Sequence, residues 1–175
     1  MPESVENPVP TCLPLPSVSA TPALGGIEPG PVAPDAARRD RDVDGRARQA
    51  RPRDALGRPL PYGARGVEPV SEDPLPPLET VEVALGLLAE GRPFSAHEVF
   101  EARWKIGPEG ERDLWQGLAQ LCVAITHALR GNPVGAQTLL ERGTQRLQQY
   151  AVTGGPTYGV VLQTFVSEAR ARITQ

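Results

Sequence analysis

Apolar residues recur at helical spacing through the second half of the chain, and turn residues separate the runs. In the first run, apolar side chains return every three or four positions, and Gly91 follows where a helix can end in a left-handed residue. The residues on this face are Leu78, Val81, Leu85 and Leu88. The pattern predicts a first helix over residues 78–90.

The next run has a start signal and a stop signal. Ser95 suits an N-cap, and Glu98 three residues later can reach back to it as a capping box. Phe94 and Val99 fit the hydrophobic staple that accompanies such a cap. The sequence predicts a second helix from Ser95 to about Ile106, before a Gly-Pro pair.

The third run is the most apolar and predicts the central helix, from Pro108 or Glu109 to Arg130. Its apolar face consists of Leu114, Leu118, Leu121 and Ile125. Gly117 and Ala124 lie beside that face. Because small residues allow two helix backbones to approach closely, we expect another helix to pack there.

Gly131, Asn132 and Pro133 suit the end of one helix, the cap of the next and its first turn. A fourth helix would carry Val134, Leu139, Leu140, Leu147 and Tyr150. A fifth, after residues 153–156, would carry Tyr158, Val161, Leu162, Phe165 and Ala169. No segment alternates as a strand does, so we expect an all-α fold: a compact bundle of about five helices built from two antiparallel hairpins.

The first part of the chain has a different composition. Sixteen of the 20 prolines fall within residues 1–77, in a stretch without helical or alternating periodicity. This composition predicts a disordered or extended Pro/Arg-rich segment over residues 1–76, followed by a helical domain over residues 77–175. Residues 38–58 hold eight arginines and four aspartates, which makes a basic arm or a solvated tail.

Few classes of partner follow from the composition. The arginines are not interleaved with aromatic residues, which argues against a nucleic-acid partner, although a protein partner or a small-molecule ligand stays open. Cys12 and Cys122 make a poor disulfide framework, and Cys122 fits a small buried hydrophobic residue. No apolar run reaches the roughly 18 residues of a membrane span, so we expect a cytoplasmic protein.

A weak internal repeat relates the two hairpins. The segment Gly91–Ala96 matches Gly131–Ala136, 40 residues further on. Helical hairpin repeats build interaction surfaces, as in tetratricopeptide arrays, so an interaction module with a basic N-terminal arm is the alternative to a binding pocket. Two units are fewer than the three or so that such arrays need.

Polar residues lie at helical spacing among these apolar positions. His97 and Glu101 share a stripe of the second predicted helix, whereas Gln116, Gln120 and His127 share a stripe of the third. Buried polar groups destabilise a protein unless they are paired. The stripes therefore form either a satisfied internal network or a functional site.

Folding the two helices back about Pro108 would place His97 level with Gln120 and Glu101 level with Gln116. Trp104 lies on the same face as His97 and Glu101. The candidate pocket therefore consists of His97, Glu101, Trp104, Gln116 and Gln120. One carboxylate, one imidazole and two amides suit hydrogen bonding to a small polar ligand.

A divalent metal is the other candidate ligand. Two imidazoles and a carboxylate, from His97, Glu101 and His127, form a set that suits iron or zinc. In the same register, however, His127 lies about 10 Å beyond His97. The pattern His-Glu-x-x-Glu lacks the second histidine of the zinc-protease motif, so the sequence predicts no particular reaction.

These motif residues also carry a family resemblance. His97-Glu98-x-x-Glu101-x-x-Trp104, Trp115-Gln116-Gly117-Leu118-x-Gln120-Leu121, and His127 with Arg130-Gly131-Asn132 and Gly135-Ala136 stand in that order. Over about residues 77–150 the chain resembles the bacterial and archaeal family catalogued as domain of unknown function 309. Arg51 to Pro61 also resembles the approach to the domain in some members. The resemblance implies a compact helical domain and no established activity.

Overall fold

The structure, a computed structural model, describes residues 51–71 and 73–174. The helices in this part of the chain are α1 Pro77–Ala89, α2 Pro93–Ile106, α3 Arg112–Leu129, α4 Pro133–Thr153 and α5 Leu162–Ile173, with a short 3-10 helix, η1, at Glu109–Glu111. No strand is formed within the described residues, and the predicted all-α bundle is confirmed.

The prediction that Ser95 caps the second helix is wrong. Helix α2 begins two residues earlier, at Pro93, and Arg92 is its N-cap residue without a side-chain cap. Proline at the first helical position has a φ angle that already suits a helix, so the helix starts there. Ser95 is instead buried inside the first turn. The corresponding cap of α4 is as predicted, because the Asn132 side chain accepts a hydrogen bond from the Gly135 amide.

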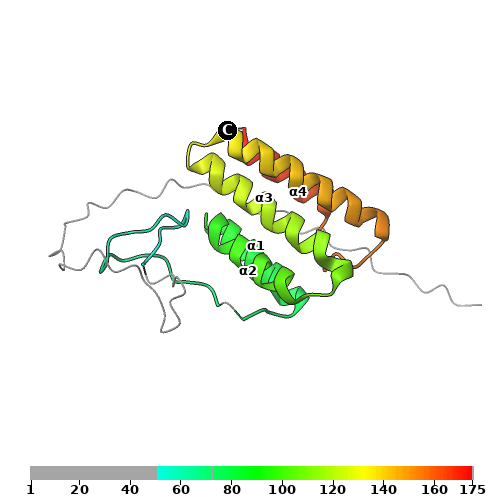
Figure 1. Ribbon diagram of the computed structural model, residues 1–175, viewed down its shortest axis with the longest axis horizontal. Coiled ribbons are helices and arrows are strands. Elements are labelled where there is room, and N and C mark those ends of the chain that lie inside the picture. The colour runs from blue at the N-terminus through cyan, green and yellow to red at the C-terminus, as the bar shows by residue number, and fades with distance from the viewer. Residues whose placement is uncertain (1–50, 72, 175) are drawn as a thin grey trace, which may run out of the picture.

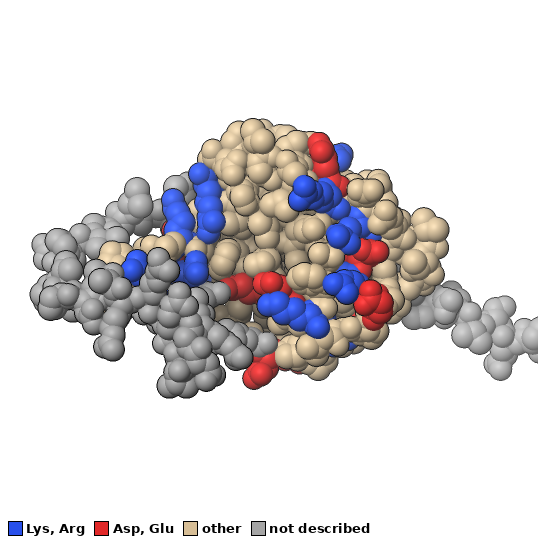
Figure 2. All heavy atoms as spheres, viewed as in Figure 1, with Lys and Arg blue, Asp and Glu red and all other residues tan. Residues whose placement is uncertain are grey.

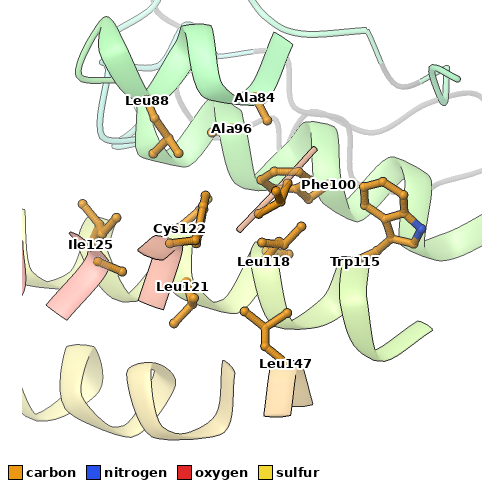
Figure 3. Packing of buried hydrophobic residues seen from close by; sticks show 14 of the residues in the cluster. Ala84, Leu88, Ala96, Phe100, Trp115, Leu118, Leu121, Cys122, Ile125 and Leu147 are labelled. Carbon is orange, nitrogen blue, oxygen red and sulfur yellow. The ribbon is translucent and has the colours of Figure 1, made fainter. Parts of the chain in front are cut away.

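Helix α3 occupies the centre of the bundle (Figure 1), between α1 and α2 on one side and α4 on the other. The fifth helix packs against both α3 and α4. The core between α3 and the first two helices is apolar and aromatic (Figure 3), with Phe100, Trp115 and Leu118 fully buried. Cys122 is also fully buried, as its predicted role requires.

Three apolar residues that the sequence assigned to helix faces lie in solvent, and one of them, Val161, precedes α5 and is 39% exposed. The other two lie at helix starts. Leu78 is 61% exposed and Val134 is 77% exposed, because each is the second residue of its helix and no other element extends over it. The buried stripe of α1 includes Thr80 instead. Its hydroxyl donates to the carbonyl of Pro76, which satisfies the buried polar group within its own helix.

The close approach predicted beside Gly117 is confirmed. A Cβ atom added to Gly117 would lie 2.8 Å from the Leu147 side chain and 3.2 Å from the Gly143 carbonyl. A Cβ on Gly143 would in turn lie 3.0 Å from the Gly117 carbonyl. Helices α3 and α4 therefore pack backbone against backbone at this pair of glycines.

The internal repeat is present in the backbone of the two turns. Gly91 and Gly131 both adopt left-handed conformations, with φ of 71° and 76°. The amide of Arg92 donates to the Leu87 carbonyl at 2.9 Å, and the equivalent amide 40 residues later, in Asn132, also donates at 2.9 Å. The α1–α2 and α3–α4 hairpins thus share one turn geometry.

Residues 51–71, here called the strap, fold against the start of α2. An antiparallel bridge joins Arg53 to Pro59. Gly57, with φ of 75°, lies so close to the Phe94 ring that a Cβ atom there would be 2.3 Å from it. Arg130 donates to the Leu56 carbonyl and so ties the strap to the end of α3. This part of the predicted N-terminal segment is packed on the helical domain.

The rest of that segment, with Cys12 and most of the basic arm, lies outside the described residues. Among the residues that the structure places, no helix has the length and apolar character needed to cross a membrane. The cytoplasmic location stays a prediction.

Candidate functional site

His97, Glu101 and Lys105 follow one another at four-residue spacing along one stripe of α2. The His97 Nε2 atom lies 3.5 Å from Glu101 Oε2, and the Lys105 ammonium lies 3.3 Å from Glu101 Oε1. The His97 side chain is 20% exposed and that of Glu101 is 33% exposed. The two residues on which the prediction centred therefore do form a partly buried pair.

The His97 ring is held from both sides. Its Nδ1 atom lies 3.3 Å from the Phe94 carbonyl. Burial lowers the pKa of His97 below the usual 6.5, although the Glu101 carboxylate acts in the opposite direction. The imidazole is therefore neutral at pH 7. Because a carbonyl oxygen only accepts, the Phe94 contact is a hydrogen bond when the proton is on Nδ1, and Nε2 then faces Glu101 as a second acceptor.

Glu101 lines a groove of about 640 Å³ that lies between α2 and the segment that precedes α1. The α2 wall consists of Phe94, Ser95, Glu98, Glu101, Ala102, Lys105 and Ile106. The opposite wall consists of Arg51 to Asp54, Gly66 to Ser71 and Pro74. This space, here called the α2 groove, lies within the size range of small-molecule sites.

Most of the charged groups that line the α2 groove have a partner. Asp54 accepts hydrogen bonds from the backbone amides of Leu56 and Arg58. Its carboxylate also forms an ion pair with the Arg58 side chain. Arg53 donates to the Gly57 carbonyl and lies over the Phe94 ring. Acidic and basic residues are interspersed on the face seen in Figure 2, so no broad field of one sign covers it.

The two glutamines of the predicted pocket do not lie in the α2 groove. Gln120 instead lines a second groove of about 430 Å³, on the opposite side of α3, with four residues of α4. These are Arg142, Gln145, Arg146 and Gln149, and the space is here called the α4 groove. Gln116 lines neither groove. The polar stripe of α3 therefore meets α4, as the ion pair between Asp113 and Arg146 also indicates.

Trp104 packs against the edge of the core and lines neither groove. The Arg112 guanidinium lies 5.8 Å from the centre of its ring. Its place is that of a partly buried core residue covered by a cation.

His127 is part of the turn between α3 and α4. Its Nδ1 atom lies 2.9 Å from the Asn132 side-chain nitrogen, while the Asn132 oxygen accepts from the Gly135 amide. The amide nitrogen of Asn132 donates, so Nδ1 accepts and the proton of the neutral ring is on Nε2. His97, Glu101 and His127 are not gathered: within the described residues, no group of three or more His, Cys, Asp or Glu side chains is placed to hold a metal ion.

Sequence reasoning missed a partly buried polar cluster around Glu111. One carboxylate oxygen accepts from the Tyr158 hydroxyl at 2.6 Å, and the other accepts from the Trp115 indole at 2.8 Å. Burial opposes ionisation of Glu111, but these hydrogen bonds outweigh it and lower the pKa. The hydrogen bond between the Tyr158 hydroxyl and Glu111 also raises the pKa of Tyr158 to about 12. The four-residue spacing of Glu111 and Trp115 could have indicated their contact on one helix face. Tyr158 lies 47 residues away in the sequence, so no local pattern indicates its contact.

Part of the chain matches one family of known proteins. Residues 81–139 match the family described as Domain of unknown function (DUF309), which confirms the resemblance seen in the sequence. The chain is also similar to the Uncharacterized protein YpuF of Bacillus subtilis (strain 168), at 39% identity over 56 residues. That match covers 31% of this chain and 32% of the relative, so the chain spans about a third of its length. No solved structure matches significantly.

Proposed function

We propose that this domain binds a small ligand in the α2 groove, and that the ligand presents an N–H donor, as a primary ammonium group does, to Glu101 and His97. The observation that carries the proposal is the pairing of a neutral imidazole with a carboxylate at 3.5 Å. Glu101 lines the groove of about 640 Å³, and His97 is its neighbour outside that lining. This ligand class replaces the broader expectation of a polar pocket between the second and third helices.

The chemistry of the pair supports an N–H donor. Nε2 of His97 and Oε2 of Glu101 are both acceptors when the histidine proton is on Nδ1, so they repel until a donor lies between them. Lys105 already occupies the other carboxylate oxygen, at 3.3 Å. An ammonium group has three donors and a positive charge, and it can satisfy both free acceptors at once.

The walls of the groove support a ligand with a short apolar part. Val70, Ala102 and Ile106 line it beside the charged groups. Ile106 is 61% exposed and so leaves apolar surface at the groove. An alkyl chain on the ammonium would cover this surface, which favours an alkylamine over a bare cation.

The internal repeat offers a matched control. Gln137 and Glu141 occupy on α4 the positions that His97 and Glu101 occupy on α2. There the amide of Gln137 donates to Glu141 at 2.7 Å, so that pair is complete without a ligand, and both residues are exposed. The same substitution at Glu101 and at Glu141 therefore separates a role in binding from a general loss of charge.

The experiment is an NMR titration of the full chain with butylammonium, followed through backbone amides. We expect shifts in α2 and the strap that are lost in Glu101→Gln and retained in Glu141→Gln. Tetramethylammonium, a cation without N–H donors, should leave these amides unchanged. Equal loss in both variants, or no shift in the wild-type protein, would overturn the proposal.

A further inference from the structure

The α4 groove has a chemistry of its own. Arg142, Gln145, Arg146 and Gln149 stand at positions i, i+3, i+4 and i+7, so they form one stripe of α4. No carboxylate is among the residues that line the groove. The adjacent acid is Asp113 of α3, which binds Arg146 at 2.6 Å and reduces the local charge. Amide and guanidinium groups therefore dominate this surface.

Gln120, on the α3 side of the groove, has an unsatisfied acceptor. Its Oε1 atom is buried and accepts no hydrogen bond from any described residue. A buried carbonyl oxygen without a donor destabilises the folded state. The terminal amide torsion of glutamine is broad, so a rotation about it can turn this oxygen toward the groove.

The two arginines supply donors in the same place. Arg142 is exposed and makes no ion pair with any residue that the structure describes. Arg146 uses one terminal nitrogen for Asp113, which leaves other donors of its five N–H groups. Guanidinium groups match the planar arrangement of oxyanion acceptors. The groove thus offers several donors together with the amide oxygens of its three glutamines, and among these oxygens that of Gln120 is buried without a donor.

We infer that the α4 groove binds a phosphate group that carries a P–OH, either inorganic phosphate or a phosphomonoester. Its unprotonated oxygens accept from Arg142 and Arg146, and its hydroxyl donates to Gln120. This inference concerns a different surface from the α2 groove and stands without the proposed function.

The buried Gln120 oxygen, which has no donor, separates this ligand from other oxyanions. At about pH 6, near the second pKa of a phosphomonoester, about half of the molecules carry a P–OH. Sulfate and dimethyl phosphate offer acceptors alone. A phosphodiester, the form found in nucleic acids and in many lipids, has no hydroxyl to donate to Gln120 and should bind more weakly.

The experiment is an NMR titration of the full chain at about pH 6 and constant ionic strength, with inorganic phosphate, methyl phosphate, dimethyl phosphate and sulfate. We expect the first two to shift amides of α3 and α4 around the groove. Arg142→Gln should weaken their binding by at least about tenfold. Gln120→Met, which keeps the side-chain length, should reduce phosphate binding to the level of sulfate.

Arg170→Gln is the charge control, because Arg170 is exposed on α5 and lines neither groove. It should leave the titration unchanged. Equal weakening by Arg170→Gln would mean a general charge effect and would overturn the inference. The same holds if sulfate binds the wild-type protein as tightly as phosphate, or if no groove amide shifts. Tighter binding of inorganic phosphate than of methyl phosphate would identify free phosphate as the ligand, and the reverse order would identify a phosphomonoester.

Discussion

The two hairpins of this domain share a turn but differ in what surrounds it. In both, a left-handed glycine ends the first helix and a proline begins the second. In the α3–α4 hairpin, Asn132 caps the second helix and binds His127. In the α1–α2 hairpin, Arg92 stands at the cap position and its side chain instead reaches the strap, at the Glu68 carbonyl.

The two hairpins also differ on their outer faces. The outer face of α4 at Glu141 is exposed, whereas the equivalent face of α2 at Glu101 is covered by the strap and forms a groove. The α4 counterpart of His97 is Gln137, which is exposed, so the second hairpin forms the same turn without an imidazole at this position. The pair His97 and Glu101 is therefore the part of the repeat that folding alone does not explain.

The largest effect is expected from the helix contact that only the second hairpin has. Gly117→Ala should lower the free energy of unfolding by about 1–3 kcal/mol, because the added Cβ overlaps Leu147 and the Gly143 carbonyl. Gly86→Ala, in the middle of α1 with nothing within 4 Å, should raise it by about 0.5–1 kcal/mol. Urea unfolding measures both. Similar changes at the two glycines would refute the proposed close packing.

The strap should separate from α2 without loss of the bundle. In Gly57→Ala, the new Cβ overlaps the Phe94 ring, and the positive φ adds a cost of about 1 kcal/mol. Gly63→Ala has the same backbone strain, at φ of 81°, but no neighbour within 4 Å. We expect faster proteolysis within residues 51–71 in the first variant only. Equal cleavage in both would show that Phe94 does not anchor the strap.

The side-chain cap of α4 should contribute to the free energy of unfolding, whereas α2 has no side-chain cap at Arg92. Asn132→Ala should lower the free energy of unfolding by about 1 kcal/mol, because the Gly135 amide loses its acceptor. His127→Leu places there the residue of the first hairpin, and a double-mutant cycle with Asn132→Ala should give a coupling of about 0.5 kcal/mol or more. Strict additivity of the two changes would argue against their hydrogen bond.

A smaller effect should appear in the pH dependence of stability. The pKa of His97 is lowered by burial, so below pH 6.5 the unfolded chain holds more protons than the folded one. The stability that depends on a neutral His97 is therefore fully present above pH 6.5 and is lost as the pH falls through the pKa of His97 in the folded state. His97→Gln, which copies Gln137, should flatten this slope in chemical unfolding. An unchanged slope would mean that a group other than His97 causes the pH dependence of stability.

The sequence predicted the helices and the central apolar face of α3 well, because both depend on local periodicity and turn residues. It was wrong about Ser95, where a proline two residues earlier decided the start of α2. It grouped Gln120 with His97 on the basis of an assumed hairpin register. Which neighbour a polar stripe meets depends on the rotation of α3 about its axis, and the glycine contact with α4 fixes that rotation.

The strap was not predicted either. Its contacts join residues far apart in the sequence, as Leu56 and Arg130 are, and a Pro-rich composition gives no sign of them. Glu101 was found from its spacing alone, but the wall opposite to it came from a segment assigned to the N-terminal tail.

That His97 offers an unprotonated Nε2 to Glu101 is tested most directly by heteronuclear NMR titration of its imidazole. The chain has two histidines, so the signals can be assigned by one substitution. We expect the neutral ring to carry its proton on Nδ1 and to titrate with a midpoint below 6.5. A proton on Nε2, or a midpoint at or above 6.5, would mean that Glu101 is already satisfied and that the pair has no need of a ligand.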